Sequence, residues 1–334
     1  MESNLKKMAA FFQEGPTRLR PHYKNHKCVA LAKRQVACGA IGMSCATLSE
    51  AEALVRSGVQ SVLLVNEIAG TAKIEKFAHL SREADLIVAV DSETTVAALA
   101  AASVRLQTPL SVVVDVDTGL RRCGVAPGES ALSLAQSAVA QGLRFRGLTG
   151  YEGHCGRMPP GPDKIDAAHR AMDKLVGTAE LIRSHGLEVD IVSAGGTGTY
   201  AISGRFPGVT EIQAGSYLVM DTDYRTVCAD FDLALSVLGT VVSRSGDERF
   251  VLDVGLKAIS AERGLPTLKN LDGARLRRLN AEHAIVDILD PKLPVEVGDQ
   301  LEIWAHYSDA TINLHRRMYG MRDGKVEEIL VMEG

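Results

Sequence analysis

The sequence predicts an α/β fold in which a (β/α)8 barrel of the TIM type is followed by an all-β domain. Eight short segments rich in β-branched residues alternate with helical patterns over the first two-thirds of the chain, and several, such as Val112–Val114, are apolar throughout. A strand with no polar face is buried on both sides, which is typical of a parallel sheet covered by helices. Alternation of strands and helices favours the barrel. An open doubly wound sheet is the alternative, which the number of strands does not exclude.

The predicted barrel strands and the helices between them have readable limits. The strands are expected at Leu19–Tyr23, Val36–Ile41, Ser61–Val65, Asp85–Val90, Ser111–Val116, Phe145–Tyr151, Val189–Ala194 and Thr210–Tyr217. The clearest helices are Glu2–Phe12, Ala51–Arg56, Ser130–Ala140 and Asp163–Ser184. Thr47 and Glu50 have the spacing of a capping box before the second of these helices, and a glycine lies just beyond the end of each of the last three.

Beyond about Tyr224 the pattern changes to strands and turns, without long helices. Strands are expected there at Ala234–Val242, Phe250–Val254, Glu282–Ile288, Gln300–Trp304 and Gly324–Met332. We therefore predict two domains, a barrel over residues 1–224 and a β-strand domain over residues 225–334.

The composition is that of a globular protein, and it gives no reason to expect a nucleic-acid or membrane partner. Of the 334 residues, 46% are apolar and 23% are charged, which argues against long disordered tracts. The 37 basic and 41 acidic residues leave a net charge of −4 and no concentrated basic charge. No apolar run approaches the ~20 residues of a membrane-spanning helix, and no signal peptide is expected. Six cysteines without a CxxC pair predict reduced thiols in a cytoplasmic protein.

Barrel enzymes carry their chemistry at the carboxyl ends of the strands, so the segments that follow the strands are the ones to search. Residues 20–27, RPHYKNHK, follow the first predicted strand. In many proteins such a segment is a solvated basic loop. The alternative is that neighbouring cations and partial burial lower the pKa of one lysine, so that it attacks a carbonyl as a Schiff-base lysine does.

Two adjacent glycine-containing segments indicate an anion site. Residues 195–199, GGTGT, follow the seventh predicted strand and open a helix, and residues 214–217, AGSY, end the eighth. Glycines allow close backbone approach, hydroxyls supply donors, and a helix N-terminus favours an anion. A tight structural turn would explain either segment alone. The pair matches the phosphate position common after the last two strands of such barrels.

Three further groups of residues stand where chemistry would be expected. The segments 117–125 (DTGLRRCGV) and 151–154 (YEGH) follow the fifth and sixth strands, although arginines are often plain surface charge. In the C-terminal part, His306 and Asp309 form an imidazole–carboxylate pair that can bind a divalent metal. The spacing of that pair is not specific by itself, because such pairs in exposed loops usually bind nothing.

Taken together, these segments resemble the fold-type III pyridoxal-phosphate family, and within it the branch of D-threonine aldolase and D-serine dehydratase. The resemblance rests on residues 20–27, 117–125, 151–154, 195–199 and 214–217 in family order, and it spans nearly the whole chain. It implies a pyridoxal 5′-phosphate cofactor, a barrel of the alanine racemase type, a divalent metal and a homodimer.

The resemblance also implies roles for individual residues. Lys24 would be the lysine that binds the cofactor aldehyde. The cofactor would further be bound by Arg122 and Tyr151 beside the ring, and by Gly195, Gly196, Thr197, Gly215 and Ser216 at the phosphate. The metal would be held by His306 and Asp309, and His154 is the proposed catalytic base.

The chain departs from the family pattern at three places. Asn25 stands where a threonine usually follows the lysine. The usual His-x-Cys metal string reads HYSDATINL over residues 306–314, and a carboxylate in place of a thiolate favours Mg²⁺ or Mn²⁺ over Zn²⁺. The chain starts with Met1 inside the first helix of the family pattern, which raises the hypothesis of a late start codon.

The resemblance implies a metal-dependent lyase that cleaves D-3-hydroxy amino acids by a retro-aldol reaction. The variant metal segment looks most like D-3-hydroxyaspartate aldolase, which yields glycine and glyoxylate, and Arg157, Arg316 or Arg317 would pair with the distal substrate carboxylate. The alternatives are a D-threonine aldolase, or a dehydratase of D-serine or D-3-hydroxyaspartate. Outside enzymes, a pyridoxal-phosphate carrier protein is the alternative, although such carriers are usually single barrels.

Overall fold

The chain divides into two compact units. The computed structural model describes all residues, Met1–Gly334. The barrel unit comprises Leu5–Gly215 together with Glu333–Gly334, and the β unit comprises Met1–Asn4 together with Ser216–Met332. Each unit therefore contains chain from both ends of the sequence.

Eight parallel strands form the centre of the barrel unit. They are β1 (Arg18–Leu19), β2 (Met43–Cys45), β3 (Ser61–Leu64), β4 (Asp85–Val90), β5 (Ser111–Asp115), β6 (Arg144–Gly150), β7 (Ile191–Ala194) and β8 (Glu211–Ile212). The order in the sheet is β1-β8-β7-β6-β5-β4-β3-β2. A parallel bridge between His22 and Ser44 then joins the segment after β1 to β2, so the sheet closes on itself. The predicted barrel is confirmed, and the open sheet is excluded.

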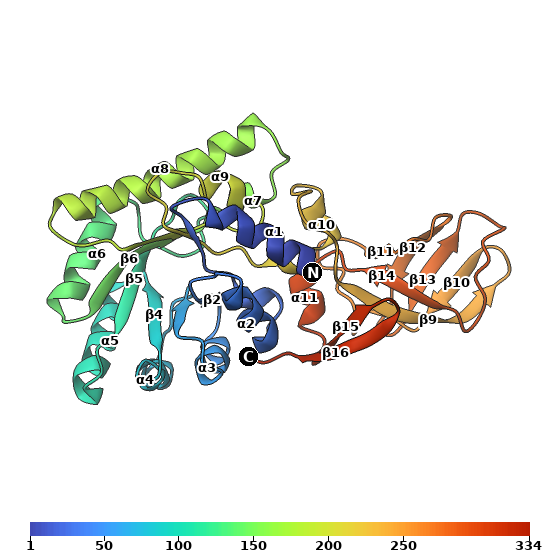
Figure 1. Cartoon of the computed structure of the whole chain (residues 1–334), viewed down its shortest axis with the longest axis horizontal. Helices are drawn as coiled ribbons and strands as arrows, with labels where there is room; N and C mark the ends of the chain where they lie inside the picture. Colours follow the sequence, from blue (N-terminus) through green and yellow to red (C-terminus); the bar gives the residue numbers. More distant parts are fainter. The chain divides into compact units, whose positions relative to one another are not determined.

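Helices cover the outside of this sheet (Figure 1). They are α1 (Glu2–Gln13), α2 (Val29–Ala37), α3 (Leu48–Arg56), α4 (Thr71–Leu80), α5 (Glu93–Leu106), α6 (Glu129–Ala140), α7 (Gly153–Gly156), α8 (Pro162–Ser184) and α9 (Tyr200–Ser203). Leu63, Ile87, Ala89, Val113 and Ile191 from four strands form a buried cluster. Because β4 and β5 are buried on both faces, the apolar runs that predicted them show no alternation.

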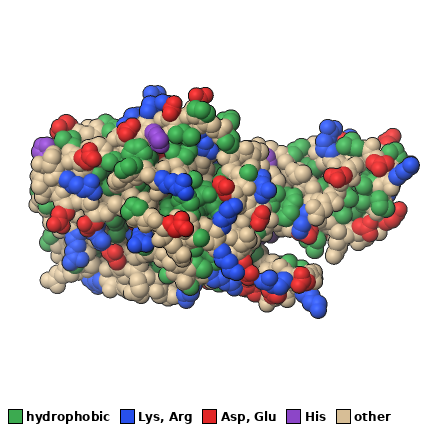
Figure 2. Space-filling model, turned by 45° about the horizontal axis from the view of Figure 1, so that its top comes forward, with side chains coloured by type: hydrophobic (Ala, Val, Ile, Leu, Met, Phe, Trp, Pro, Cys, Tyr) green, Lys and Arg blue, Asp and Glu red, His purple; other side chains and the backbone are tan.

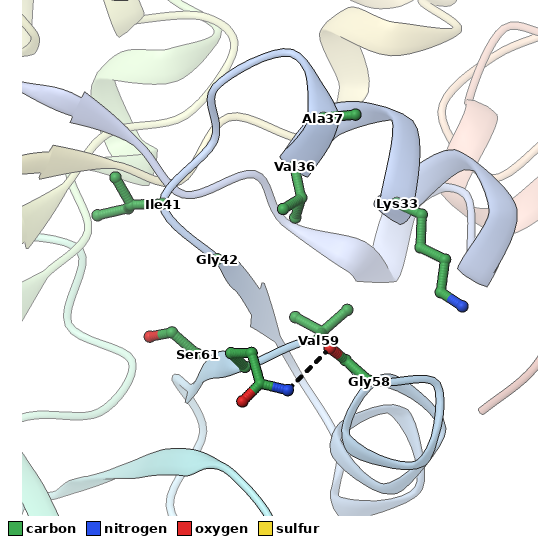
Figure 3. Close-up of a pocket in the computed structure, with 9 residues that line it drawn as sticks. Lys33, Val36, Ala37, Ile41, Gly42, Gly58, Val59 and Ser61 are labelled. Carbon is green, nitrogen blue, oxygen red and sulfur yellow. Dashed lines mark hydrogen bonds between the residues drawn. The ribbon is translucent and has the colours of Figure 1, made fainter.

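The predicted strand Val36–Ile41 is wrong. The helical run that starts at Val29 continues through Val36 to Ala37, and the strand is the shorter segment Met43–Cys45. Val36 and Ile41 are 38% and 40% exposed, so this apolar run lies at the surface rather than in the sheet. The two side chains line a shallow hollow of about 300 Å³ at the amino ends of β2 and β3, away from the carboxyl ends of the strands (Figure 3). The eighth strand is also shorter than predicted and ends at Ile212.

The β unit contains a six-stranded antiparallel sheet and a separate hairpin, which confirms the all-β prediction. Its strands are β9 (Ser236–Ser245), β10 (Arg249–Leu252), β11 (Thr267–Leu268), β12 (Ala274–Leu279), β13 (Ala284–Ile288), β14 (Gln300–Trp304), β15 (Arg317–Arg322) and β16 (Lys325–Val331). Its short helices are η2 (Ser216–Leu218), α10 (Thr222–Arg225) and α11 (Ser308–Ile312). Phe250, Val286 and Ile303 are fully buried in its core. The strands β11, β12 and β15 were not predicted, because their apolar residues are few or interrupted by arginines.

The last residues of the chain return to the barrel unit and pack beside the segment that carries Lys24. The backbone N–H of Glu333 donates to the carbonyl of Lys27 at 2.6 Å. The hydroxyl of buried Tyr23 donates to the carbonyl of Glu333 at 2.7 Å. These two hydrogen bonds flank Lys24 in sequence, so residue 333 is part of what orders this segment.

The surface and the cysteines agree with the composition. None of the helices has the length and apolar character that crossing a membrane would require. On the face drawn in Figure 2, basic and acidic side chains are interspersed rather than gathered into a patch of one sign. All six cysteines are free thiols.

Candidate active site

Lys24 lies at the carboxyl end of β1, as expected for a barrel enzyme. It is the middle residue of a single 3-10 turn, η1 (Tyr23–Asn25), in which Tyr23 and Asn25 are buried. The ring of His22 accepts a hydrogen bond from the backbone N–H of Lys24 at Nδ1, and so caps the turn. The Lys24 side chain itself is exposed rather than partly buried as predicted, because its two neighbours take the inward positions.

Two buried histidines lie on either side of Lys24. Burial lowers the pKa of His22 well below its usual value, and the positive charges of Lys24 and Arg122 lower it further. Burial also lowers the pKa of His26 to about 4. The backbone N–H of Cys28 donates to Nδ1 of His26, and Nε2 lies 3.0 Å from the Gln35 side-chain oxygen, so the neutral ring protonated at Nε2 fits both partners.

The pH dependence of stability follows from these histidines. In the unfolded chain, His26 takes up a proton below about pH 6.5, whereas in the folded protein it stays neutral down to about pH 4. The contribution of His26 to the free energy of unfolding is therefore fully present above pH 6.5 and is lost as the pH falls from 6.5 to 4. We expect the wild type to lose about 2 kcal/mol more stability between pH 7 and pH 5 than His26→Gln does. Urea unfolding at both pH values measures this. The exposed control His185→Gln should behave as the wild type does.

The segment between β7 and α9, residues 195–199, is called the glycine loop below. Gly195 has φ +77°, a conformation that favours glycine, and a Cβ there would lie 2.6 Å from Ile212. The N–H groups of Gly195 and Gly196 are both used inside the protein, by the Glu152 carboxylate and the Thr199 hydroxyl. The two glycines thus contribute backbone shape, and the following residue, buried Thr197, lies at the centre of the loop.

Gly215 brings the end of β8 against the segment that carries Lys24. A Cβ at this position would lie 2.8 Å from the carbonyl oxygen of His22 and 3.5 Å from the Cβ of Asn25. Only a residue without a side chain permits this approach. Ser216, the other residue expected at the phosphate, follows in the chain as the first residue of the β unit.

Arg122, Tyr151 and His154 meet at the same end of the barrel. The guanidinium carbon of Arg122 lies 5.8 Å from the centre of the Tyr151 ring. A Cβ on Gly196 would lie 3.2 Å from the same ring, and one on Gly119 would lie 3.1 Å from the imidazole of His154. The segments after β5, β6 and β7 therefore converge, and an arginine, a phenol and an exposed imidazole stand beside the glycine loop.

Sequence reasoning missed a group of acidic residues at the carboxyl ends of β3, β4 and β5. Ligand atoms of Glu67, Asp91 and Cys123 lie within 4.8 Å of one another. Burial raises the pKa of Asp115 to about 8, and the Glu67 carboxylate raises it as well, while Arg122 opposes the shift. Glu67 and Asp91 closely follow β3 and β4, and Asp115 ends β5, which was a usable signal, but these residues are too far apart in sequence to reveal one cluster.

His306 and Asp309 lie in the β unit, where the structure gives the imidazole a defined orientation. Nδ1 of His306 is 2.7 Å from the Thr222 hydroxyl, and Asp309 is in the first turn of α11. Gly264 lies beside the other edge of the ring, and a Cβ on this glycine would lie 2.8 Å from Nε2 of His306. A hydrogen bond on one ring nitrogen, with no side chain against the second, is the arrangement found in metal-binding histidines, so the imidazole of His306 suits a divalent metal.

The barrel residues also fit a phosphorylated aldehyde cofactor. The glycine loop and Gly215 let the segments after β7, β8 and β1 approach one another more closely than side chains would allow, and Thr197 brings a hydroxyl to the loop. Lys24 offers an amine at the end of β1, and Arg122 offers a cation above the Tyr151 ring. This combination of amine, phosphate loop and ring-facing cation is what pyridoxal phosphate needs from a protein.

Comparison with known proteins decides the family. The alanine racemase N-terminal domain family matches residues 1–223, and a serine dehydratase domain matches residues 234–321. The chain is 35% identical to a D-threonine aldolase of Arthrobacter sp and 33% identical to a 3-hydroxy-D-aspartate aldolase of Paracoccus denitrificans, each over 98% of this chain and 88% of the relative. A D-threo-3-hydroxyaspartate dehydratase of Delftia sp is 31% identical over 93% of this chain and 88% of the relative.

A solved structure agrees with this result. The crystal structure of D-threonine aldolase from Filomicrobium marinum matches with a TM-score of 0.95 and 36% identity, covering 99% of this chain and 91% of that one. The chain belongs to the fold-type III pyridoxal-phosphate enzymes. Because the relatives reported above, which match more than nine-tenths of the chain, are aldolases and a dehydratase, it is a lyase. The resemblance found in the sequence is confirmed.

Proposed function

We propose that this lyase cleaves D-3-hydroxyaspartate to glycine and glyoxylate in a retro-aldol reaction. The observation that carries the proposal is the convergence of Lys24, Arg122, Tyr151 and the glycine loop at one end of the barrel. The relatives named as 3-hydroxy-D-aspartate aldolase and as D-threo-3-hydroxyaspartate dehydratase support this class of substrate.

Each residue has a role in this proposal. Lys24 provides the amine to which the cofactor aldehyde is attached, and Thr197, Gly215 and Ser216 hold its phosphate. Arg122 and Tyr151 orient the ring. When bound, pyridoxal phosphate accepts the electron pair of the bond that breaks at the substrate Cα. His154 takes the proton of the substrate β-hydroxyl, so that the Cα–Cβ bond breaks, glyoxylate leaves and Cα is protonated to give glycine.

For the metal, we propose that His306 and Asp309 hold a divalent ion. A carboxylate and an imidazole without a thiolate favour Mg²⁺ or Mn²⁺ over Zn²⁺. Such an ion supplies Lewis-acid polarisation of an oxygen. Dialysis against a chelator followed by readdition of single metals tests this, with His306→Ala as the variant that should no longer respond to the ion.

The product of a single assay separates the candidate reactions. Protein loaded with pyridoxal phosphate and Mn²⁺ is incubated with D-3-hydroxyaspartate, and glyoxylate is expected. Oxaloacetate would instead indicate dehydration, and equal rates on D-threonine and D-3-hydroxyaspartate would remove the preference for an acidic substrate. A cofactor carrier would give no product with or without metal.

Arg157 is the cation we propose for the distal carboxylate of the substrate. It follows α7 three residues after His154, in the same unit as Lys24, whereas Arg316 and Arg317 belong to the β unit. Arg157→Met should lower kcat/KM for D-3-hydroxyaspartate by about 10- to 100-fold, because a charge-assisted pair is lost, and change kcat/KM for D-threonine by less than about threefold. The exposed neighbour of the site Arg121→Met is the control. Equal losses on both substrates would contradict the assignment.

We further propose that the protein acts as a cytoplasmic homodimer. The hairpin β15–β16 pairs Tyr319 with Ile329, and these side chains are 56% and 55% exposed. A two-stranded ribbon is only marginally stable on its own, and an exposed apolar pair of this kind favours a partner surface. Light scattering coupled to size-exclusion chromatography would give twice the 35.7 kDa chain mass for a dimer.

A further inference from the structure

Glu152 is a fully buried carboxylate directly after β6, between Tyr151 and α7. One of its oxygens, Oε2, accepts a hydrogen bond from the backbone N–H of Gly195 at 3.0 Å. The other, Oε1, accepts from the hydroxyls of Thr199 at 2.6 Å and Ser203 at 2.5 Å. These donors come from the first residue of the glycine loop, its last residue and the helix that follows it.

The surroundings of Glu152 indicate how this carboxylate acts. A buried carboxylate is costly unless donors satisfy its oxygens, and two donors from the loop and one from α9 do so here. Both oxygens face those donors, and a negative charge would repel a phosphate. Glu152 is therefore not a ligand of the anion, and its effect must pass through the loop.

The hydrogen bonds of Glu152 continue into the loop through Thr199. Because the Thr199 hydroxyl donates a hydrogen bond to Glu152, its lone pairs are left to accept the N–H of Gly196 at 3.3 Å. The backbone of Gly198 in turn packs on α7, where a Cβ would lie 2.0 Å from the carbonyl oxygen of Gly156. Glu152 thus fixes both ends of the loop, α7 packs against Gly198, and Thr197 lies at the centre of the loop.

We propose that Glu152 is the positioning residue of the phosphate loop, holding residues 195–199 in the shape that receives the phosphate of the cofactor before it binds. This inference rests on the proposed cofactor site and adds to it a residue that contacts neither the phosphate nor the reacting atoms. It predicts that Glu152 matters for the phosphate end of the cofactor and not for its ring.

The test compares two ligands that differ only in the phosphate. Full-length protein freed of cofactor with hydroxylamine is titrated with pyridoxal phosphate and with pyridoxal, and the ratio of the two Kd values gives the phosphate preference. Glu152→Ala should lower this preference about tenfold or more, with the Kd of pyridoxal within about threefold of the wild type, because the loop and α9 together lose three hydrogen bonds.

Glu152→Gln should lower the preference less than Glu152→Ala does. Its amide oxygen can accept from Gly195, and its NH2 can donate to the hydroxyls of Thr199 and Ser203, which rotate to accept. That NH2 group competes with the N–H of Gly196 for Thr199, so the rescue should be partial. A glutamine variant that lowers the preference as much as alanine does would show that hydrogen bonds from this side chain do not hold the loop, and would overturn the positioning role.

A pair of threonine variants keeps the test decisive if Glu152→Ala fails to fold, as judged by thermal melts followed by circular dichroism. Thr199 and Thr178 are each 2% exposed, and each accepts a glycine N–H, from Gly196 at 3.3 Å and from Gly128 at 2.9 Å. Thr199→Val should lower the phosphate preference, and the matched control Thr178→Val should leave it at the wild-type value.

The outcomes separate this inference from the proposed function. If Glu152→Ala and Thr199→Val both kept the wild-type ratio of the two Kd values, the role of Glu152 would be overturned, and the proposed cofactor site would be unaffected. A wild type that binds pyridoxal as tightly as pyridoxal phosphate would instead sink the proposed phosphate loop itself.

Discussion

Lys24→Ala is expected to abolish attachment of pyridoxal phosphate and to lower lyase activity on the order of 10³-fold or more, because the substitution removes the amine that holds the cofactor aldehyde. Lys24 stands on a turn whose neighbours Tyr23 and Asn25 are buried, so the loss of its exposed side chain should leave the fold intact. The absorbance band of the lysine-bound cofactor, near ~420 nm, should be missing. Borohydride should then fix no cofactor to the protein.

A lysine three residues further on provides the matched control. Lys27 belongs to the same basic segment, and Lys27→Ala should keep the absorbance band and the borohydride adduct, because the carbonyl that Glu333 contacts is retained. Peptide mapping of the reduced wild type should find the cofactor on Lys24. Its recovery on any other residue would contradict both this prediction and the proposed site.

Glu211→Gln is expected to lower the free energy of unfolding by about 3–5 kcal/mol, the usual cost of breaking a buried ion pair by removing one partner. Glu211 on β8 accepts a hydrogen bond from Nε of Arg20 at 2.9 Å, and the two side chains are 5% and 3% exposed for Arg20 and Glu211. Arg20 also donates to the Ser61 hydroxyl at the start of β3. The uncompensated guanidinium would stand where the sheet closes, at the start of the segment that carries Lys24.

Urea unfolding of the full chain measures this loss. An exposed pair, Arg105 with Glu75, is the control, and Glu75→Gln should change stability by no more than about 1 kcal/mol. Replacing both buried partners, as in Arg20→Met with Glu211→Leu, should recover part of the loss, since no buried charge is then left unpaired. A single Glu211→Gln variant as stable as Glu75→Gln would show that the pair contributes nothing to closing the barrel.

The sequence predicted strands best where both faces of the strand are buried. β4 lies at Asp85–Val90, as predicted, because a strand buried on both faces needs an uninterrupted apolar run. The same reasoning failed at Val36–Ile41, where the apolar run belongs to a helix end and a surface hollow. An apolar run alone does not show whether its residues repeat with the period of a helix or with that of a strand. The short strand Met43–Cys45 contains no such run, because a buried serine is at its centre.

For the site, residue patterns located the segments but not their hydrogen bonds. Lys24 and the glycine loop could be identified because each follows a strand and each has a composition suited to one chemistry. Glu152 lay inside a segment already singled out, yet its donors are 43 to 51 residues away in sequence. No local pattern states which distant N–H or hydroxyl a carboxylate will meet. The expected partial burial of Lys24 was wrong for the same reason, because the exposure of this lysine depends on which of its neighbours turn inward.

The return of residue 333 to the barrel has a consequence for biosynthesis. The contacts of Glu333 with Lys27 and Tyr23 join positions more than 300 residues apart. A ribosome has to translate the whole β unit before these contacts can form, even though the eight strands are complete much earlier. Nascent barrels should therefore mature late, acquiring a fully ordered Lys24 turn only after residue 333 has left the exit tunnel.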